Sequence, residues 1–306
     1  MKVSQLTSSE LEYRLKHPGI SIRTGAFTSR IQSPFPSVAE GIGLLYGDYP
    51  VVEQDGFADF HVGVARPHDL RRWFKPQVQF LLDGVSTFLP LPASQAFPML
   101  EWGLNWCVSN HAHRYLMIHA AVVEKDGYAA ILPAPPGSGK STLCAALVNR
   151  GWRLLSDELT LVRLSDGKII PVPRPVSLKN ASIDVMKSYV PEGVFNRPVT
   201  DTVKGTVAHM KAPSDSVARA AEVALPGWVI FPKYQPGSPA LLEPLPRAHA
   251  FMQVADNSFN YSELGLKAFE TLSGLIGVSQ CYRFTYSILD EAIETFAALK
   301  TPASLL

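Results

Sequence analysis

The chain has 306 residues, of which 46% are hydrophobic and 18% are charged, and its formal net charge is +1. This composition is typical of a globular protein and excludes a disordered chain. The balanced charge also argues against nucleic acid as the main partner, because binding to phosphate backbones requires concentrated Lys and Arg.

The apolar residues are spread along the chain. The start of the chain lacks an apolar segment of signal-peptide length, and no later window approaches the ~20 apolar residues needed to cross a bilayer. We therefore expect no membrane span and a cytoplasmic protein. The three cysteines lie far apart in apolar surroundings without metal-type pairing, and we interpret them as buried thiols: Cys107, Cys144 and Cys281.

The first part of the chain mixes turn-rich stretches with strand-like runs. We expect strands over residues 56–64 and 77–89, the second of them broken by a tight turn at Asp83-Gly84. After two prolines, apolar residues recur at helical spacing over residues 94–108. The pattern predicts a small β-rich module with a linking helix over residues 1–110, followed by a second domain over residues 111–306.

The second domain opens with a predicted hairpin, formed by residues 115–123 and 128–133 around the turn at 125–127. A helix over residues 140–150 follows, with Gly151 at the position of a carboxyl-terminal cap. Further along, we expect strands, an irregular polar segment typical of a mobile active-site region, and a closing amphipathic helix. The strands cover 152–156, 159–164, 168–172, 228–231 and 282–286, the irregular segment covers 173–213, and the helix covers 289–299.

The segment between the hairpin and the helix is rich in glycine and reads Ala134-Pro-Pro-Gly-Ser-Gly-Lys-Ser-Thr142. A strand, a glycine loop ending in Gly-Lys-Ser and a helix form the context of a phosphate-binding loop, in which backbone N–H groups and the helix dipole face one anion. Ala134 replaces the first glycine of the usual pattern, at a position that mainly needs a small residue. The sequence therefore predicts that a nucleoside triphosphate is held by Pro136, Gly137, Ser138, Gly139, Lys140, Ser141 and Thr142.

Within this loop, Lys140 would reach the β- and γ-phosphates and the Ser141 hydroxyl would ligate Mg²⁺. Asp157 and Glu158 end the next strand, and a parallel arrangement of strands would bring both acids to the edge of the sheet where the phosphates lie. One acid could then hold the metal while the other accepts a proton. The alternative is a pair of solvated residues at a strand end.

Three further polar residues are candidates for the site. His119 interrupts an apolar strand that pairs with the strand leading into the loop, although a lone histidine there is also typical of a hydrogen-bonded core residue. Lys204 and His209 lie in a polar segment beside a glycine, where a loop could close over phosphates or simply face solvent. Arg174 and Lys179 are weaker candidates, because basic residues in irregular segments are usually exposed.

Taken together, these motifs resemble the HPr kinase/phosphorylase family. The resemblance rests on His119-Ala-Ala-Val, the Pro136-Gly-Ser-Gly-Lys-Ser-Thr loop, and Arg150-Gly-Trp-Arg-Leu-Leu-Ser-Asp-Glu158. With Trp102-Gly-Leu-Asn-Trp-Cys107 and Lys204-Gly-Thr-Val-Ala-His209 added, the chain is more similar to the group called HPr-kinase-related kinase A, which is associated with bacterial exosortase neighbourhoods.

The resemblance implies an α/β (α+β) fold with an HPr-kinase/PEP-carboxykinase-like phosphate-loop core, ATP as donor and Mg²⁺ as cofactor. It implies Asp157 as the catalytic acid that deprotonates a serine hydroxyl, Glu158 as a magnesium ligand, and His119 near the transferred phosphate. The family is hexameric, so a homo-oligomer is conceivable, although the different amino-terminal module could block that assembly. The family's signature after the acidic pair is absent, and Pro173–Lys179 stands there instead. Neither phosphorolysis nor HPr as acceptor is therefore implied.

The sequence thus favours an ATP-dependent kinase that phosphorylates a hydroxyl, with serine preferred, on a peptide, protein or small molecule. A catalytically weak nucleotide-binding regulatory module is the alternative. A motor-type ATPase or GTPase fits poorly, because those place the metal-holding aspartate on a strand further along the chain, and no N-K-x-D string or arginine finger is found.

Overall fold

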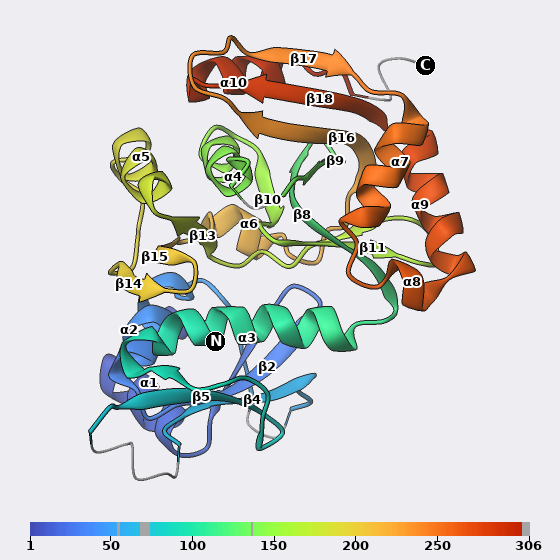
Figure 1. Ribbon diagram of the computed structural model, residues 1–306. Coiled ribbons are helices and arrows are strands. Elements are labelled where there is room, and N and C mark those ends of the chain that lie inside the picture. The colour runs from blue at the N-terminus through green and yellow to red at the C-terminus, as the bar shows by residue number, and fades with distance from the viewer. Residues whose placement is uncertain (54–55, 68–73, 136, 302–306) are drawn as a thin grey trace.

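The computed structural model describes residues 1–53, 56–67, 74–135 and 137–301, and it has a mixed α/β fold (Figure 1). A mostly antiparallel sheet lies at one end of the molecule and a larger mixed sheet forms the other, with a long helix, α3 (Ala96–His111), between them. Within the described ranges, no helix is both long enough and apolar enough to cross a membrane.

The first sheet has the strand order β3-β1-β2-β4-β5-β6, and β7 pairs with β5 outside that path. The predicted turn at Asp83-Gly84 is confirmed, since both residues have positive φ and join β5 to β6. The sequence pattern did not predict two helices and one 3-10 turn that pack with this sheet. They are α1 (Ser8–Lys16), α2 (Pro36–Leu45) and η1 (Val3–Gln5). The strands are β1 (Ile20–Thr24), β2 (Phe27–Gln32), β3 (Val51–Val52), β4 (Phe60–Ala65), β5 (Gln77–Leu82), β6 (Val85–Ser86) and β7 (Leu91–Pro92).

Helix α3 joins this sheet to the rest of the chain. It follows a short 3-10 turn, η3 (Ala93–Gln95), and extends three residues beyond the predicted end at 108. Gly103 lies against the ring of fully buried Phe80 of β5, so closely that a Cβ atom would fall 2.1 Å from a ring carbon. The absence of a side chain at this position lets α3 pack directly on the sheet.

The second sheet has the order β12-β11-β8-β9-β16-β18-β17, with β10 also paired to β8. Strands β9, β16 and β18 run parallel, whereas the other pairs are antiparallel. The strands are β8 (Tyr115–Lys125), β9 (Tyr128–Pro133), β10 (Arg153–Ser156), β11 (Leu159–Arg163), β12 (Ile169–Ile170), β16 (Leu225–Tyr234), β17 (Leu241–Pro244) and β18 (Gln280–Tyr286).

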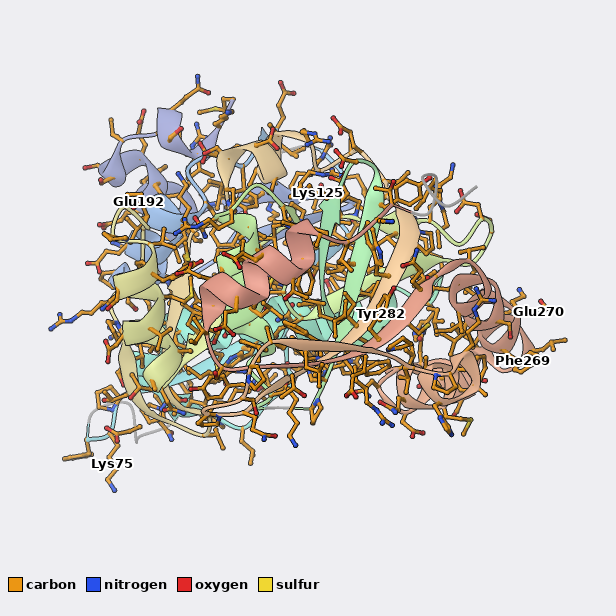
Figure 2. The ribbon with its side chains drawn as sticks, turned by 90° about the horizontal axis from the view of Figure 1, so that it is seen from above. Lys75, Lys125, Glu192, Phe269, Glu270 and Tyr282 are labelled. Carbon is orange, nitrogen blue, oxygen red and sulfur yellow. The ribbon has the colours of Figure 1, made fainter. Side chains whose placement is uncertain are left out.

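Alternation along β8 divides the core between the two faces of this sheet. One face packs against helices α7 (Arg247–Asp256) and α9 (Leu266–Val278), with α8 (Tyr261–Leu264) beside them. The other face packs against α4 (Lys140–Val148) and α10 (Leu289–Ala297). In Figure 2, Phe269 and Glu270 project from α9 at the periphery of the molecule, which marks the outer side of the first face.

The predicted hairpin leading into the glycine loop is confirmed. Strands β8 and β9 pair from Ala120 with Pro133 to Lys125 with Tyr128, and the turn residues Asp126 and Gly127 both have positive φ. The helix predicted after the loop is also present, although it ends at Val148. Gly151, with φ of 93°, therefore lies beyond the cap position predicted for it.

The prediction of an irregular segment over residues 173–213 is wrong, whereas its mobility stays a prediction. That stretch contains β13 (Val176–Lys179), α5 (Ala181–Tyr189), β14 (Val199–Thr202) and β15 (Gly205–Met210), and the strands form a small antiparallel sheet in the order β13-β15-β14. A short helix, α6 (Ser214–Ala218), follows it. The prolines that suggested irregular structure lie at the ends of these elements, where a missing N–H is tolerated. The three cysteines are buried and free, as predicted.

Two glycines in helices allow the packing of α3 to be tested. Gly103→Ala should destabilise the protein by about 1–3 kcal/mol, because the new methyl group overlaps Phe80. Gly274→Ala is the matched control, because nothing lies within 4 Å of its Cβ position, and it should stabilise α9 by about 0.5–1 kcal/mol. Chemical denaturation of both variants would measure the difference, and equal effects would contradict the packing described.

Candidate functional site

The glycine-rich segment between β9 and α4 turns sharply before the helix. Gly137 and Gly139 both have positive φ, at 85° and 86°, and Gly139 is the N-cap residue of α4. No side chain caps this helix, and its first intrahelical bond runs from the Leu143 N–H to the Gly139 carbonyl. The N–H groups of the first turn are thus left for an external acceptor. Pro136, also predicted to bind the nucleotide, lies outside the described residues.

Two parallel strands, β16 and β18, hold this loop by hydrogen bonds to its backbone carbonyls. The backbone N–H of Tyr234 at the end of β16 donates to the Ser138 carbonyl at 2.9 Å, and the Tyr286 hydroxyl of β18 donates to the Gly139 carbonyl at 3.0 Å. A Cβ atom on Gly139 would lie 2.6 Å from that hydroxyl, whereas one on Gly137 would meet nothing within 4 Å. The loop is therefore packed on the side of Gly139 and open at Gly137.

Lys140 is the first residue of α4, and only 8% of it is exposed. Burial lowers the pKa of its ammonium, while the charges of Asp157 and Glu158 raise it. Within the described part of the chain, the ammonium makes no hydrogen bond or ion pair of its own. A buried ammonium without a partner can form an ion pair with an anion that binds at the glycine loop.

The two predicted acids interrupt a strand. Ser156 of β10 pairs with Val122 and Leu159 of β11 pairs with His119, so the register along β8 is the same on both sides of the acids. Asp157 and Glu158 leave the ladder at the level of Ala121 and Ala120, which pair on their other side with the last two residues of β9. The predicted juxtaposition of acids and loop is therefore present, with β8 lying between their two strands.

Asp157 is buried, and its two carboxylate oxygens differ. Oδ2 accepts a hydrogen bond from the Ser177 N–H at 2.9 Å, whereas Oδ1 is buried without a hydrogen-bond partner among the described residues. Burial raises the pKa of Asp157 to about 6, and the charge of Glu158 adds to the rise. The Ser177 N–H, Lys140 and the Ser141 hydroxyl all act in the opposite direction. This carboxyl is thus poised to exchange a proton near neutral pH.

Glu158 has a different environment. Its side chain is 19% exposed, its Oε2 accepts a hydrogen bond from the Asn105 amide, and its Oε1 lies 3.8 Å from the Lys179 ammonium. Burial raises the pKa of Glu158, but the charges of Lys204 and Lys179 outweigh that effect, and the pKa lies below its ordinary value. Neighbouring carboxyls with pKa values moved in opposite directions can take different roles, one as an anion and the other as a proton acceptor.

His119 lies on β8 opposite Leu159, on the face of the sheet that α4 covers. Its ring centroid is 5.5 Å from that of Phe259. Burial and, to a smaller extent, the Lys140 charge lower the pKa of His119 to about 4. The imidazole is therefore neutral at physiological pH, and the charges of Lys140 and Glu158 both act on it.

The remaining two predicted residues do not share one loop. Lys204 is exposed in the turn between β14 and β15, with its ammonium 5.2 Å from the centre of the Trp102 ring. His209 lies inside β15, is 1% exposed, and packs edge-on against Phe97 at 5.4 Å. The solvent-facing loop considered for His209 is thus wrong, because residues 207–210 of β15 are all buried. Neither ring nitrogen of His209 has a hydrogen-bond partner among the described residues.

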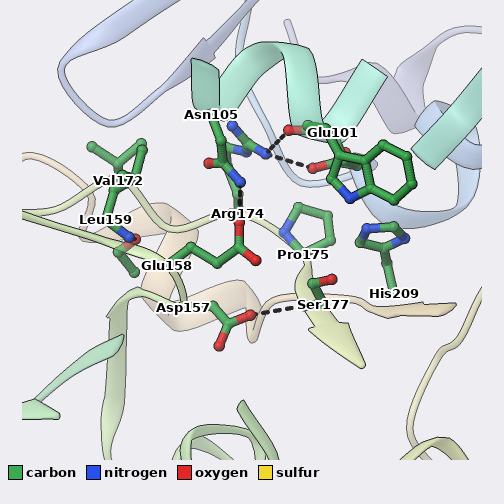
Figure 3. Close-up of a pocket in the computed structure, with 12 residues that line it drawn as sticks. Glu101, Asn105, Asp157, Glu158, Leu159, Val172, Arg174, Pro175, Ser177 and His209 are labelled. Atoms are coloured by element: carbon green, nitrogen blue, oxygen red, sulfur yellow. Dashed lines mark hydrogen bonds and ion pairs between the residues drawn. The ribbon is translucent and has the colours of Figure 1, made fainter. Parts of the chain in front are cut away.

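A small cavity of about 20 Å³ adjoins the acids, which is room for roughly one water molecule (Figure 3). Sequence reasoning missed its wall on α3, where Glu101 forms a buried ion pair with Arg174 at 2.7 Å and accepts a hydrogen bond from the Tyr46 hydroxyl at 2.6 Å. Arg174 was expected to be exposed and is buried. The sequence signal was on α3 itself, since Glu101 and Asn105 are two polar residues one turn apart in the mostly apolar middle of this helix.

The donors near Lys140 fit a metal that arrives with a nucleotide rather than a site built wholly from protein. Within the described ranges, no group of three or more His, Cys, Asp or Glu side chains gathers to hold a metal ion. Asp157, Glu158 and the Ser141 hydroxyl supply hard oxygen donors, and Mg²⁺ is commonly held by one or two carboxylates together with phosphates. The unpartnered Oδ1 of Asp157 is consistent with such a ligand.

No protein-family model matches the chain, and no curated protein matches it. Among solved structures, the chain is similar to one titled as the HPr(Ser) kinase/phosphatase from Coxiella burnetii, with 13% sequence identity and a TM-score of 0.26. The similarity covers 59% of this chain and 95% of that one. This similarity is too low to support a conclusion about function, so the site is assigned from the geometry of its residues.

The buried charge of Asp157 yields a prediction about stability. Its carboxyl titrates near 3.8 when unperturbed and at about 6 in the folded protein, so folding favours the protonated form and stability falls as pH rises through this interval. Asp157→Asn removes that cost and should stabilise the metal-free protein at about pH 8 by up to about 3 kcal/mol, at about 1.4 kcal/mol per pKa unit. The gain should fall to about 0.6 kcal/mol near pH 4.

Urea denaturation in EDTA at the two pH values measures this effect. The control is Asp184→Asn on the exposed side of α5, which should change stability little at either pH. A loss of stability at pH 8 on replacing Asp157 would contradict the described burial of its charge.

Proposed function

We propose that this chain is an ATP-dependent, Mg²⁺-requiring phosphotransferase that moves the γ-phosphate of ATP to a hydroxyl group, with serine the preferred acceptor. One observation carries the proposal: a buried lysine without an ion-pair partner begins an uncapped helix behind two positive-φ glycines and faces a buried acid with a free oxygen. The resemblance to HPr kinases in motif order points to the same chemistry. A phosphate-loop fold and ATP as the nucleotide are parts of this proposal.

Binding would use the loop and the first turn of α4. The open face at Gly137 would admit the phosphates, the unbonded N–H groups at the start of α4 would donate hydrogen bonds to them, and Lys140 would offset their charge. Thr142 and Ser138 lie on the same turn, and the buried Ser138 hydroxyl has no hydrogen-bond partner among the described residues. Mg²⁺, held by the Ser141 hydroxyl and Glu158, would supply further neutralisation of phosphate charge.

Transfer would use Asp157. Its raised pKa suits a general base near neutral pH, and its free Oδ1 can take the proton of an acceptor hydroxyl. The acceptor oxygen then bonds to the γ-phosphorus while the bond from that phosphorus to the β–γ bridging oxygen breaks, releasing ADP. Neutral His119 and exposed Lys204 are assigned to the surroundings of the transferred phosphate, and buried His209 to the wall beyond the acids.

Nucleotide binding is the first test. Lys140→Ala should weaken ATP binding by about 10- to 100-fold, because a hydrogen bond to a charged group is worth about 1.5–3 kcal/mol. Titration with a fluorescent ATP analogue measures the affinity, and Lys187→Ala on the exposed face of α5 is the matched control. Unchanged affinity in a folded Lys140→Ala protein would sink the proposal.

Phosphotransfer is the second test. In single-turnover assays with γ-labelled ATP and serine-containing peptides or small alcohols, Asp157→Asn should slow transfer by about 100-fold or more while nucleotide affinity changes little. Asp184→Asn should behave as wild type. Transfer by Asp157→Asn at the wild-type rate would remove the general-base role. Tight Mg²⁺-dependent binding by the wild type with no transfer to any acceptor would instead favour the regulatory module.

A further inference from the structure

The acidic pair is completed by a helix that belongs to the other end of the molecule. Asn105 of α3 donates its side-chain amide to Oε2 of Glu158, across 53 residues of sequence (Figure 3). The second oxygen of Glu158 faces Lys179 on β13. The orientation of this carboxylate is therefore set by two segments, neither of which is part of the glycine loop or of the strand that carries the acid.

Helix α3 is itself held firmly against this site. Glu101, one turn before Asn105 on the same face, forms the buried ion pair with Arg174, and Arg174 also donates to the Glu101 carbonyl at 2.9 Å. On the neighbouring face, the Trp102 ring lies under the Lys204 ammonium. The opposite side of α3 is anchored in the first sheet by close contact between Gly103 and Phe80. Asn105 is thus carried on a rigid element.

An amide has a particular advantage in this position. A neutral donor on Oε2 fixes the carboxylate without cancelling more of its charge, whereas a lysine or arginine at the place of Asn105 would add to the Lys179 ammonium, 3.8 Å from Oε1, in competing with a bound cation. Residues that hold a metal ligand in place by hydrogen bonds typically change metal affinity or activity by about 10- to 100-fold when removed. Asn105 has the chemistry and the placement of such a residue.

We propose that Asn105 is a positioning residue that orients Glu158 toward the Mg²⁺ of a bound Mg–ATP, so that the amino-terminal part of the chain forms part of the nucleotide site. The inference rests on the proposed function, because it assumes that Glu158 serves the metal. It assigns to α3 a role in metal-dependent binding and no contact with the nucleotide itself.

The test measures binding and does not depend on turnover. Asn105→Ala should raise the Mg²⁺ concentration needed for half-maximal tightening of binding of a fluorescent ATP analogue by about 10-fold or more, while affinity for the same analogue in EDTA stays at the wild-type value. Asn110→Ala is the matched control, because this exposed asparagine of α3 bonds only within its own helix, and it should leave both values unchanged.

Thermal melting of each variant checks the fold, and Asn105→Ser provides a second, smaller alteration at the same position. A folded Asn105→Ala protein with the wild-type Mg²⁺ requirement would overturn the positioning role while leaving the proposed function intact. Equal weakening with and without Mg²⁺ would also overturn it, since a general disturbance of the site would produce that result. Absence of analogue binding by the wild type would overturn the proposed function and the inference with it.

Discussion

The withdrawal of Lys140, Asp157 and Glu158 from water is the constraint on which the site depends. Two adjacent carboxylates repel each other more strongly as water is removed, and a buried ammonium is costly without a partner. The surrounding structure offsets these costs unevenly: basic side chains and an amide favour the charge of Glu158, while Asp157 receives one backbone N–H and keeps a free oxygen. This asymmetry makes the two acids chemically different although they are neighbours in sequence.

Local sequence signals predicted the centre of the site. The Lys125-Asp126-Gly127 turn fixed the hairpin, and the glycines at 137 and 139 marked positive φ before a helix. The position of the two acids was also predictable, because the elements around them are short and follow one another along the chain with few connecting residues. Where the acids lie beside β8 therefore depends on pairing between neighbouring segments. A prediction of this kind needs no knowledge of distant contacts, and the division of the chain near residue 110 remains a prediction.

The parts that sequence could not predict depend on contacts between distant residues. Arg174 pairs with Glu101 and Asn105 with Glu158, at separations of 73 and 53 residues, and a single sequence does not show which polar side chains meet at such distances. The structure of residues 173–213 was predicted wrongly for a related reason. Its short strands are defined by pairing with one another in a small sheet, and the prolines and polar residues of the segment obscured them in the sequence.

The brace behind the glycine loop has a consequence for how the protein matures. Everything recognisable in the nucleotide motif is present once residue 158 has been synthesised, yet the carbonyl of Gly139 is held by a tyrosine close to the end of the chain, at position 286. During synthesis the contact from β16 can form first, and the loop lacks its second contact until β18 has left the ribosome and paired with β16. A nascent or truncated chain that ends before β18 would carry the complete motif with only the Tyr234 contact behind its loop.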